Sequence, residues 1–256
     1  MAHLAEYFSQ LLYIWRGNNS RVVCRHWSFL IGKYNETGRV ACLDSVFAQD
    51  LGTIRLSELD TSNEPRDMAS FEGKVILLVG GASGVGLATA KLLASRGAHL
   101  SVADVNADVT TVIAQQIPST DKVKVTAHQV DITDQSAVQA LIVATMKEHG
   151  RIDGCANIAG VIGRLNGLNI WETERSQFDF VMGVNAGGLF NLLAAELKPG
   201  ILPDGASIVN VASILSLRAS PKSSPYITSK HAVQGLTKAA AMDAAPRNIR
   251  VNCVAP

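Results

Sequence analysis

The sequence has few cysteines, little net charge and no long apolar run. Its four cysteines, Cys24, Cys42, Cys155 and Cys253, lie too far apart for the close pairs of a zinc site and are too few for a secreted disulfide scaffold. We therefore expect reduced thiols and a cytoplasmic protein. The formal net charge of +1, without a cluster of Lys and Arg, argues against nucleic acid as a partner. No uninterrupted apolar run reaches about 18 residues, so we expect no membrane-spanning segment.

The composition changes near residue 68. Eight of the aromatic residues (four Tyr, seven Phe and three Trp in all) fall before this point, whereas Ala, Val and Gly dominate residues 68–256. Apolar residues recur at helical spacing over residues 4–15 and predict one short amphipathic helix. We expect residues 1–67 to be a poorly ordered leader. Residues 68–256 are expected to form one globular domain, for which the 47% hydrophobic content is sufficient.

A glycine-rich turn lies between a predicted strand and a predicted helix. Residues 75–79 are a continuous apolar run, residues 79–86 read Val-Gly-Gly-Ala-Ser-Gly-Val-Gly, and residues 87–95 have helical spacing. Glycine lets a backbone turn sharply and approach a pyrophosphate, whose charge the helix N-terminal amides stabilise. Turns also collect glycine for other reasons, so this motif alone indicates either a tight turn or a dinucleotide site. The candidate cofactor contacts here are Gly80, Ser83, Gly84, Val85 and Gly86.

An acidic residue follows the next predicted strand, residues 99–103. Asp104 lies 18 residues after Gly86, close to the distance at which a ribose-binding acid is expected. A carboxylate there accepts hydrogen bonds from ribose hydroxyls and repels a 2′-phosphate, and no Arg or Lys stands beside it or in the turn. The sequence therefore favours NAD over NADP. The alternative for Asp104 is a solvated loop acid.

Further predicted strands alternate with helices and end at candidate cofactor contacts. Residues 123–130 and 152–156 are strands of this kind, and residues 248–254 predict a sixth strand. The pattern predicts a three-layer α/β doubly wound parallel sheet (Rossmann fold), with strand order 3-2-1-4-5-6 and the cofactor across the carboxyl ends of the strands. The residues expected there are Asp131, Ile132, Asn157, Ala159 and Gly160. For Asp131 the alternative is an Asp that opens the following helix.

From residue 71 to residue 256 the chain resembles the classical short-chain dehydrogenase/reductase family. The family's Thr-Gly-x-x-x-Gly-x-Gly turn is matched by residues 79–86, with Val79 in place of Thr. Its Asn-Asn-Ala-Gly motif is matched by residues 157–160, with Ile158 in place of the second Asn. Both departures remove side-chain hydrogen bonds and keep the glycines. We therefore expect a looser central sheet and retained cofactor binding.

The family's catalytic set is matched at four positions, Tyr226, Lys230, Ser213 and Asn185. Residues at i and i+4 share a helix face, so Lys230 is expected below the Tyr226 ring, where its charge acts on the phenol. The resemblance implies that Tyr226 contacts the cofactor and exchanges a proton with the substrate oxygen, and that Ser213 hydrogen-bonds the same oxygen. It also implies that Lys230 binds the nicotinamide ribose and that Asn185 binds a water that links Lys230 to solvent. Taken alone, each residue also has a structural alternative. Tyr226 would be an interface aromatic and Lys230 a surface charge, while Ser213 would cap a helix and Asn185 would form a turn.

The resemblance implies an oxidoreductase that transfers a hydride between a nicotinamide cofactor and a secondary alcohol or ketone, as a homodimer or homotetramer. Residues 71–76, Phe-Glu-Gly-Lys-Val-Ile, resemble the start of tailoring dehydrogenases of fungal secondary metabolism, including terpenoid pathways. The family continues beyond the position of Pro256 with a loop, a substrate lid and a seventh strand, which we expect this chain to lack. The alternative function is therefore a truncated, non-catalytic dinucleotide-binding protein.

Overall fold

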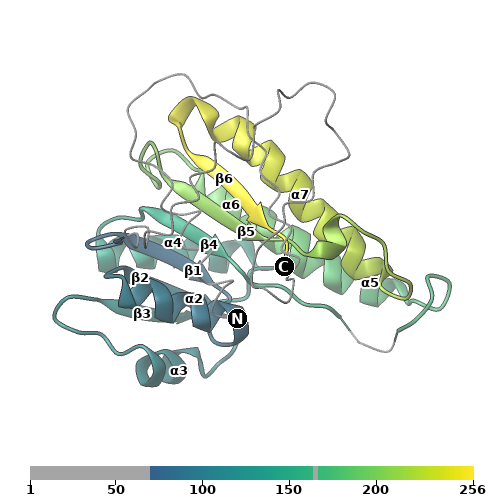
Figure 1. Ribbon diagram of the computed structural model, residues 1–256, viewed down its shortest axis with the longest axis horizontal. Helices are drawn as coiled ribbons and strands as arrows, with labels where there is room; N and C mark the ends of the chain where they lie inside the picture. Colours follow the sequence, from purple (N-terminus) through teal and green to yellow (C-terminus); the bar gives the residue numbers. More distant parts are fainter. Residues whose placement is uncertain (1–69, 164–166) are drawn as a thin grey trace, which may run out of the picture.

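The computed structural model describes residues 70–163 and 167–256, and the helix predicted within residues 4–15 lies outside them. Strands and helices alternate along the described chain (Figure 1). The strands are Val75–Val79 (β1), His99–Asp104 (β2), Val125–Gln129 (β3), Gly154–Asn157 (β4), Ser207–Val211 (β5) and Arg250–Val254 (β6). The helices are Gly84–Ser95 (α2), Val109–Gln116 (α3), Gln135–His149 (α4), Arg175–Met182 (α5), Leu189–Glu196 (α6) and Ser224–Ala244 (α7). One π-helix, Gly183–Gly188 (η2), joins α5 to α6.

The six described strands form one parallel sheet in the order β3-β2-β1-β4-β5-β6, which confirms the predicted topology. Every residue of β1 is buried, as the continuous apolar run predicts for a strand covered on both faces. Leu77 and Val79 pack in one core with side chains from α4, α6 and α7. Ile76 and Leu78 pack in the other core, against α2 and α3. The sheet is therefore the middle of three layers.

Helix α2 begins at Gly84, three residues before the predicted start at Leu87. The glycine turn itself supplies the first helical turn, because the Leu87 N–H donates to the Ser83 carbonyl oxygen over 3.0 Å. The end of the helix agrees with prediction, since Arg96 is its C-cap. The amide-rich N-terminus of α2 consequently lies inside the glycine motif, where an anion would bind.

The α5–η2–α6 run, Arg175–Glu196, is long and apolar enough to cross a membrane by length and composition alone, with a mean hydropathy of 1.3. Three of its apolar side chains, Leu189, Leu192 and Leu193, are buried in the core that α4 and α7 share. Burial in this core accounts for these three leucines, whereas Phe180 and Phe190 of the same run are each 56% exposed.

Candidate active site

The glycine-rich turn after β1 leaves no room for side chains on its inner side. Gly80 has a φ of +90°, and a Cβ there would lie 2.5 Å from the Ala159 backbone nitrogen. A Cβ on Gly86 would lie 1.8 Å from the Gly80 carbonyl oxygen. Gly84, with a φ of +53°, has no atom within 4 Å of its Cβ position, so the turn is open on that side. A close-packed turn with an open face at a helix N-terminus fits a dinucleotide pyrophosphate.

The Asp104 carboxylate joins this turn to the end of β2 by a hydrogen bond. Its Oδ2 accepts a hydrogen bond of 2.9 Å from the Ala82 N–H, and its Oδ1 accepts one of 3.0 Å from the Asn106 N–H. An ionised carboxylate has about four acceptor positions, so two remain for ribose hydroxyls. The carboxylate thus lies next to the turn, as its spacing predicts. Sequence reasoning missed its second role in holding the turn.

Asp131 and Ile132 follow β3 and differ in orientation. Asp131 is exposed, and its Oδ1 accepts hydrogen bonds from the backbone and hydroxyl of Thr133. The alternative role, opening the next helix, belongs instead to Asp134, which caps α4 by accepting from the Ser136 and Ala137 N–H groups. The Ile132 side chain is 6% exposed and lies in the core. If Ile132 contacts the cofactor as predicted, it does so through its backbone atoms.

Residues 157–160 comprise the last residue of β4 and the turn that follows it. The Asn157 side chain is 4% exposed and points into the core, where its Nδ2 donates to Asn210 Oδ1 over 3.0 Å. The Ile158 and Ala159 N–H groups both donate to the Val79 carbonyl oxygen, over 2.8 and 2.9 Å. These backbone bonds join the turn to the end of β1 at the two places where the sequence departs from the family motif. Whether the central sheet is looser stays a prediction.

Gly160 lies in this turn next to two of the predicted catalytic residues, Asn185 and Lys230. A Cβ on Gly160 would lie 3.1 Å from Asn185 Oδ1 and 3.2 Å from Lys230 Nζ. Any larger residue would therefore press on both groups. The turn after β4 and the lysine of α7 are thus in direct contact, although they are far apart in sequence.

Tyr226 and Lys230 lie on one face of α7, as their spacing predicts. The Lys230 Nζ is 5.6 Å from the centroid of the Tyr226 ring and donates a hydrogen bond of 2.9 Å to the Val211 carbonyl oxygen. Lys230 is 3% exposed, and this burial lowers its pKa to about 8. The ammonium form therefore still predominates at neutral pH.

Ser213 lies just beyond the end of β5, two residues after the carbonyl that holds Lys230. It is the N-cap of the 3₁₀-helix Ile214–Ser216 (η3), and its Oγ accepts a hydrogen bond of 3.2 Å from the Leu215 N–H. The Gln234 Nε2 donates to Ser216 Oγ over 2.6 Å and so ties η3 to α7. The loop that carries Ser213 is therefore fixed to the helix that carries Tyr226.

Asn185 lies in the π-helix η2 and is 2% exposed. Its Oδ1 accepts from the Val161 N–H over 2.7 Å, and its Nδ2 donates to the Val161 carbonyl and to Ser229 Oγ, over 2.8 and 2.9 Å. The Asn185 side chain thus connects the loop after β4 to α7 by hydrogen bonds. Sequence reasoning predicted neither this role nor the partner residue, Ser229. Both donor positions of the amide are used, whereas Oδ1 keeps one acceptor position, so the predicted water between Lys230 and solvent stays a prediction. Single π-helical turns are frequent at functional sites.

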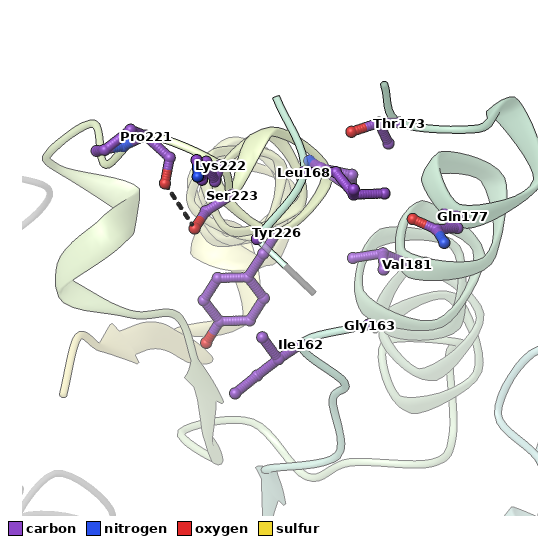
Figure 2. Close-up of a pocket in the computed structure, with 12 residues that line it drawn as sticks. Ile162, Gly163, Leu168, Thr173, Gln177, Val181, Pro221, Lys222, Ser223 and Tyr226 are labelled. Carbon is purple, nitrogen blue, oxygen red and sulfur yellow. Dashed lines mark hydrogen bonds between the residues drawn. The ribbon is translucent and has the colours of Figure 1, made fainter. Parts of the chain in front are cut away.

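A cavity of about 180 Å³ adjoins Tyr226, between the start of α7, α5 and the loop after β4. Figure 2 shows the Tyr226 ring extending from α7 toward Ile162. Val181 and Leu168 add further apolar walls, and Thr173 and Gln177 bring polar groups. The lining therefore combines apolar and polar groups beside Tyr226, as small-molecule sites do.

The sequence model for short chain dehydrogenases matches residues 74–256. The chain belongs to the short-chain dehydrogenase family. Membership confirms the resemblance, and it makes the chain an oxidoreductase that acts on CH–OH groups of small alcohols or on ketones, with a nicotinamide cofactor. Among the residues the structure describes, no cluster of His, Cys, Asp or Glu could hold a metal ion.

Several named proteins are similar to this short-chain dehydrogenase. The short-chain dehydrogenase/reductase aba4 of Botryotinia fuckeliana is 43% identical over 73% of this chain and 72% of its own length. Levodione reductase of Leifsonia aquatica is 35% identical over 73% of this chain and 69% of its own. Among solved structures, NAD⁺-bound xylitol dehydrogenase superposes with a TM-score of 0.65 at 30% identity, covering 73% of this chain and 70% of that one.

Proposed function

We propose that this chain is an NAD-dependent dehydrogenase or reductase of a secondary alcohol or ketone in fungal secondary metabolism. The observation that carries the cofactor preference is the Asp104 carboxylate, which lies against the glycine turn with acceptor positions to spare. The fungal assignment rests on the similarity to aba4 of Botryotinia fuckeliana. The NAD⁺-bound state of xylitol dehydrogenase supports the same cofactor.

In the proposed reaction, the substrate oxygen lies in the cavity at the Tyr226 hydroxyl, which gives it a proton in reduction and takes one in oxidation. Ser213 orients the same oxygen, and the Lys230 ammonium stabilises the phenolate left when Tyr226 gives up its proton. When bound, the nicotinamide ring supplies or accepts the hydride. Asn185 and Ser229 hold the loop and helix that carry these groups in register.

The cofactor proposal is tested by titrating NADH and NADPH by fluorescence against the wild type, Asp104→Asn and Asp104→Ala. The Asn variant keeps an oxygen for the Ala82 N–H and loses the charge, so we expect its preference for NADH over NADPH to shrink. The Ala variant loses both, and its NADH affinity should fall about 10- to 100-fold, because charged hydrogen bonds contribute about 1.5–3 kcal/mol. Tighter binding of NADPH than NADH by the wild type would contradict the preference. NADH binding without turnover of any ketone would favour the non-catalytic alternative.

The same proposal includes assembly into a homodimer or homotetramer. Phe180 on α5, Phe190 on α6 and Met242 on α7 are large apolar side chains that are 56 to 60% exposed. Large apolar groups left in water favour association between protein surfaces. We expect Phe180→Glu combined with Phe190→Glu to shift the protein to monomers in sedimentation experiments. Thr111→Glu, at an exposed polar residue of α3, is the control and should not. A monomeric wild type would contradict the proposal.

A further inference from the structure

A glutamate lies at the centre of the core, outside the catalytic set. Glu196 is the last residue of α6 and is 0% exposed. Its Oε2 accepts a hydrogen bond of 3.1 Å from the Asn157 Nδ2, which also donates to Asn210 Oδ1 over 3.0 Å. Asn210 in turn donates to Thr237 Oγ1 on α7 over 3.0 Å. The cluster therefore connects α6, the neighbouring strands β4 and β5, and α7.

Two acceptors in this cluster have no donor among the described residues, Glu196 Oε1 and Asn157 Oδ1. With an ionised carboxylate, both oxygens are buried without a hydrogen bond, and a full charge is buried as well. A proton on Oε1 makes it a donor. A carboxylic acid and an amide then form a reciprocal pair, in which each group donates one bond and accepts one.

We propose that Glu196 is a positioning residue that, as a neutral carboxylic acid, donates to Asn157 Oδ1 while accepting from Asn157 Nδ2, and thereby sets the turn at residues 157–160. This inference rests on the proposed function, because that turn lies in the proposed cofactor site.

The effect reaches both halves of the site through contacts already described. Asn157 ends β4, and the next two N–H groups, of Ile158 and Ala159, both bond to the Val79 carbonyl that precedes the glycine turn. Gly80 packs directly on the Ala159 nitrogen, and Gly160 packs on Lys230 Nζ. A shift of Asn157 therefore moves the pyrophosphate turn and the lysine together. Packed interiors transmit such shifts because they contain few voids.

The surroundings favour the neutral acid near physiological pH. Burial raises the pKa of Glu196 to about 7, against the smaller lowering effects of the Asn157 hydrogen bond and the nearby Cys155 thiol. The Cys155 thiol, on β4, is the titratable group in contact, and its own pKa is raised by burial and by Glu196. Asn210 on β5 and Thr237 on α7 carry no charge, and no charged side chain in the described residues offsets the burial of Glu196. The other site group that titrates near this range is Lys230, whose pKa burial lowers to about 8.

The test follows NADH affinity against pH in the wild type, Glu196→Gln and Glu196→Met. Gln keeps a donor that cannot ionise, whereas Met removes both bonds. We expect the NADH affinity of the wild type to fall about fivefold as the pH rises through about 7. A fivefold change corresponds to the net contribution of about one buried hydrogen bond. The Gln variant should keep its NADH affinity over the same pH range. Lys230 is present in all three proteins, so its titration contributes equally to the three pH profiles. The Met variant should bind about fivefold more weakly at acidic pH as well, where Gln restores binding.

An infrared measurement gives a reading that does not need the cofactor. The carbonyl band of a protonated carboxylic acid should be present in the wild type at about pH 6, should disappear on raising the pH, and should be absent from Glu196→Gln at both values. An unchanged band in the Gln variant, or a Gln variant that repeats the wild-type pH profile, would overturn the proposal. Absence of NADH binding in every variant would contradict the proposed function, while the infrared band would still decide the protonation of Glu196.

Discussion

Tyr226→Phe is expected to lower kcat/KM for alcohol or ketone turnover by about 10²- to 10⁴-fold while leaving NADH affinity unchanged. This range is typical for removal of a general acid or base. The substitution deletes the hydroxyl at the cavity but keeps the ring that faces the Lys230 ammonium. Turnover is measured by NADH absorbance with a panel of small ketones, and binding by cofactor fluorescence.

Thr228→Ala is the matched control for this substitution. Thr228 is exposed on the same helix, and its hydroxyl donates to the Ser224 carbonyl within that helix. Its loss should change neither turnover nor binding. Turnover by Tyr226→Phe at the wild-type rate would show that the proton passes through another group, and a joint loss of NADH binding would indicate a disturbed fold.

Gly86→Ala is expected to weaken NADH binding by about 10- to 100-fold and to lower the free energy of unfolding by about 1–3 kcal/mol, the usual cost of overpacking. The added Cβ would lie 1.8 Å from the Gly80 carbonyl oxygen and 2.8 Å from its carbon. Both are backbone atoms, so the clash cannot be relieved by a change of rotamer. The glycine turn itself has to open, and its amides then no longer converge on the pyrophosphate.

Gly235→Ala separates this effect from a general loss of glycine. Gly235 lies within α7, and its Cβ position has no atom within 4 Å. Ala favours the helix over Gly by about 1 kcal/mol, so this variant should unfold at equal or higher urea concentration and bind NADH normally. Normal NADH binding by Gly86→Ala would contradict the assignment of the turn to the cofactor.

The sequence predicted those features that depend on spacing along the chain. The apolar run of β1, the distance from Gly86 to Asp104 and the four-residue step from Tyr226 to Lys230 each correspond to an arrangement in the structure. The strand order followed from the alternation of strands and helices, because parallel connections have few permitted topologies. The start of α2 was less accurate, because glycines that signal a turn also began the helix.

The sequence could not predict which way a side chain points once a strand has ended. Asn157 and Ile132 were expected at the cofactor, but both side chains face the core. Asn157 belongs to β4, one residue beyond the predicted end of that strand, so its direction is set by the sheet. Ile132 lies beyond β3, where strand alternation no longer sets the direction of a side chain. The role of Glu196 depends on a partner 39 residues away, and nothing in its local pattern of apolar neighbours indicates that contact. Its charge within an otherwise apolar helical stripe is the one signal that could have drawn attention to it.

The bond between Asp104 and Ala82 has a consequence for the evolution of cofactor choice. In the proposed function one carboxylate serves both purposes, so a lineage that moved toward NADP by replacing this acid would also lose the Ala82 bond, leaving the bonds from the Gly80 and Gly81 N–H groups to the Ala103 carbonyl to join the turn to β2. The first mutation would thus be penalised twice, and a compensating change in the turn would have to come before it or with it. Cofactor choice and turn geometry are therefore epistatic at this position, which makes an altered preference harder to reach by single substitutions.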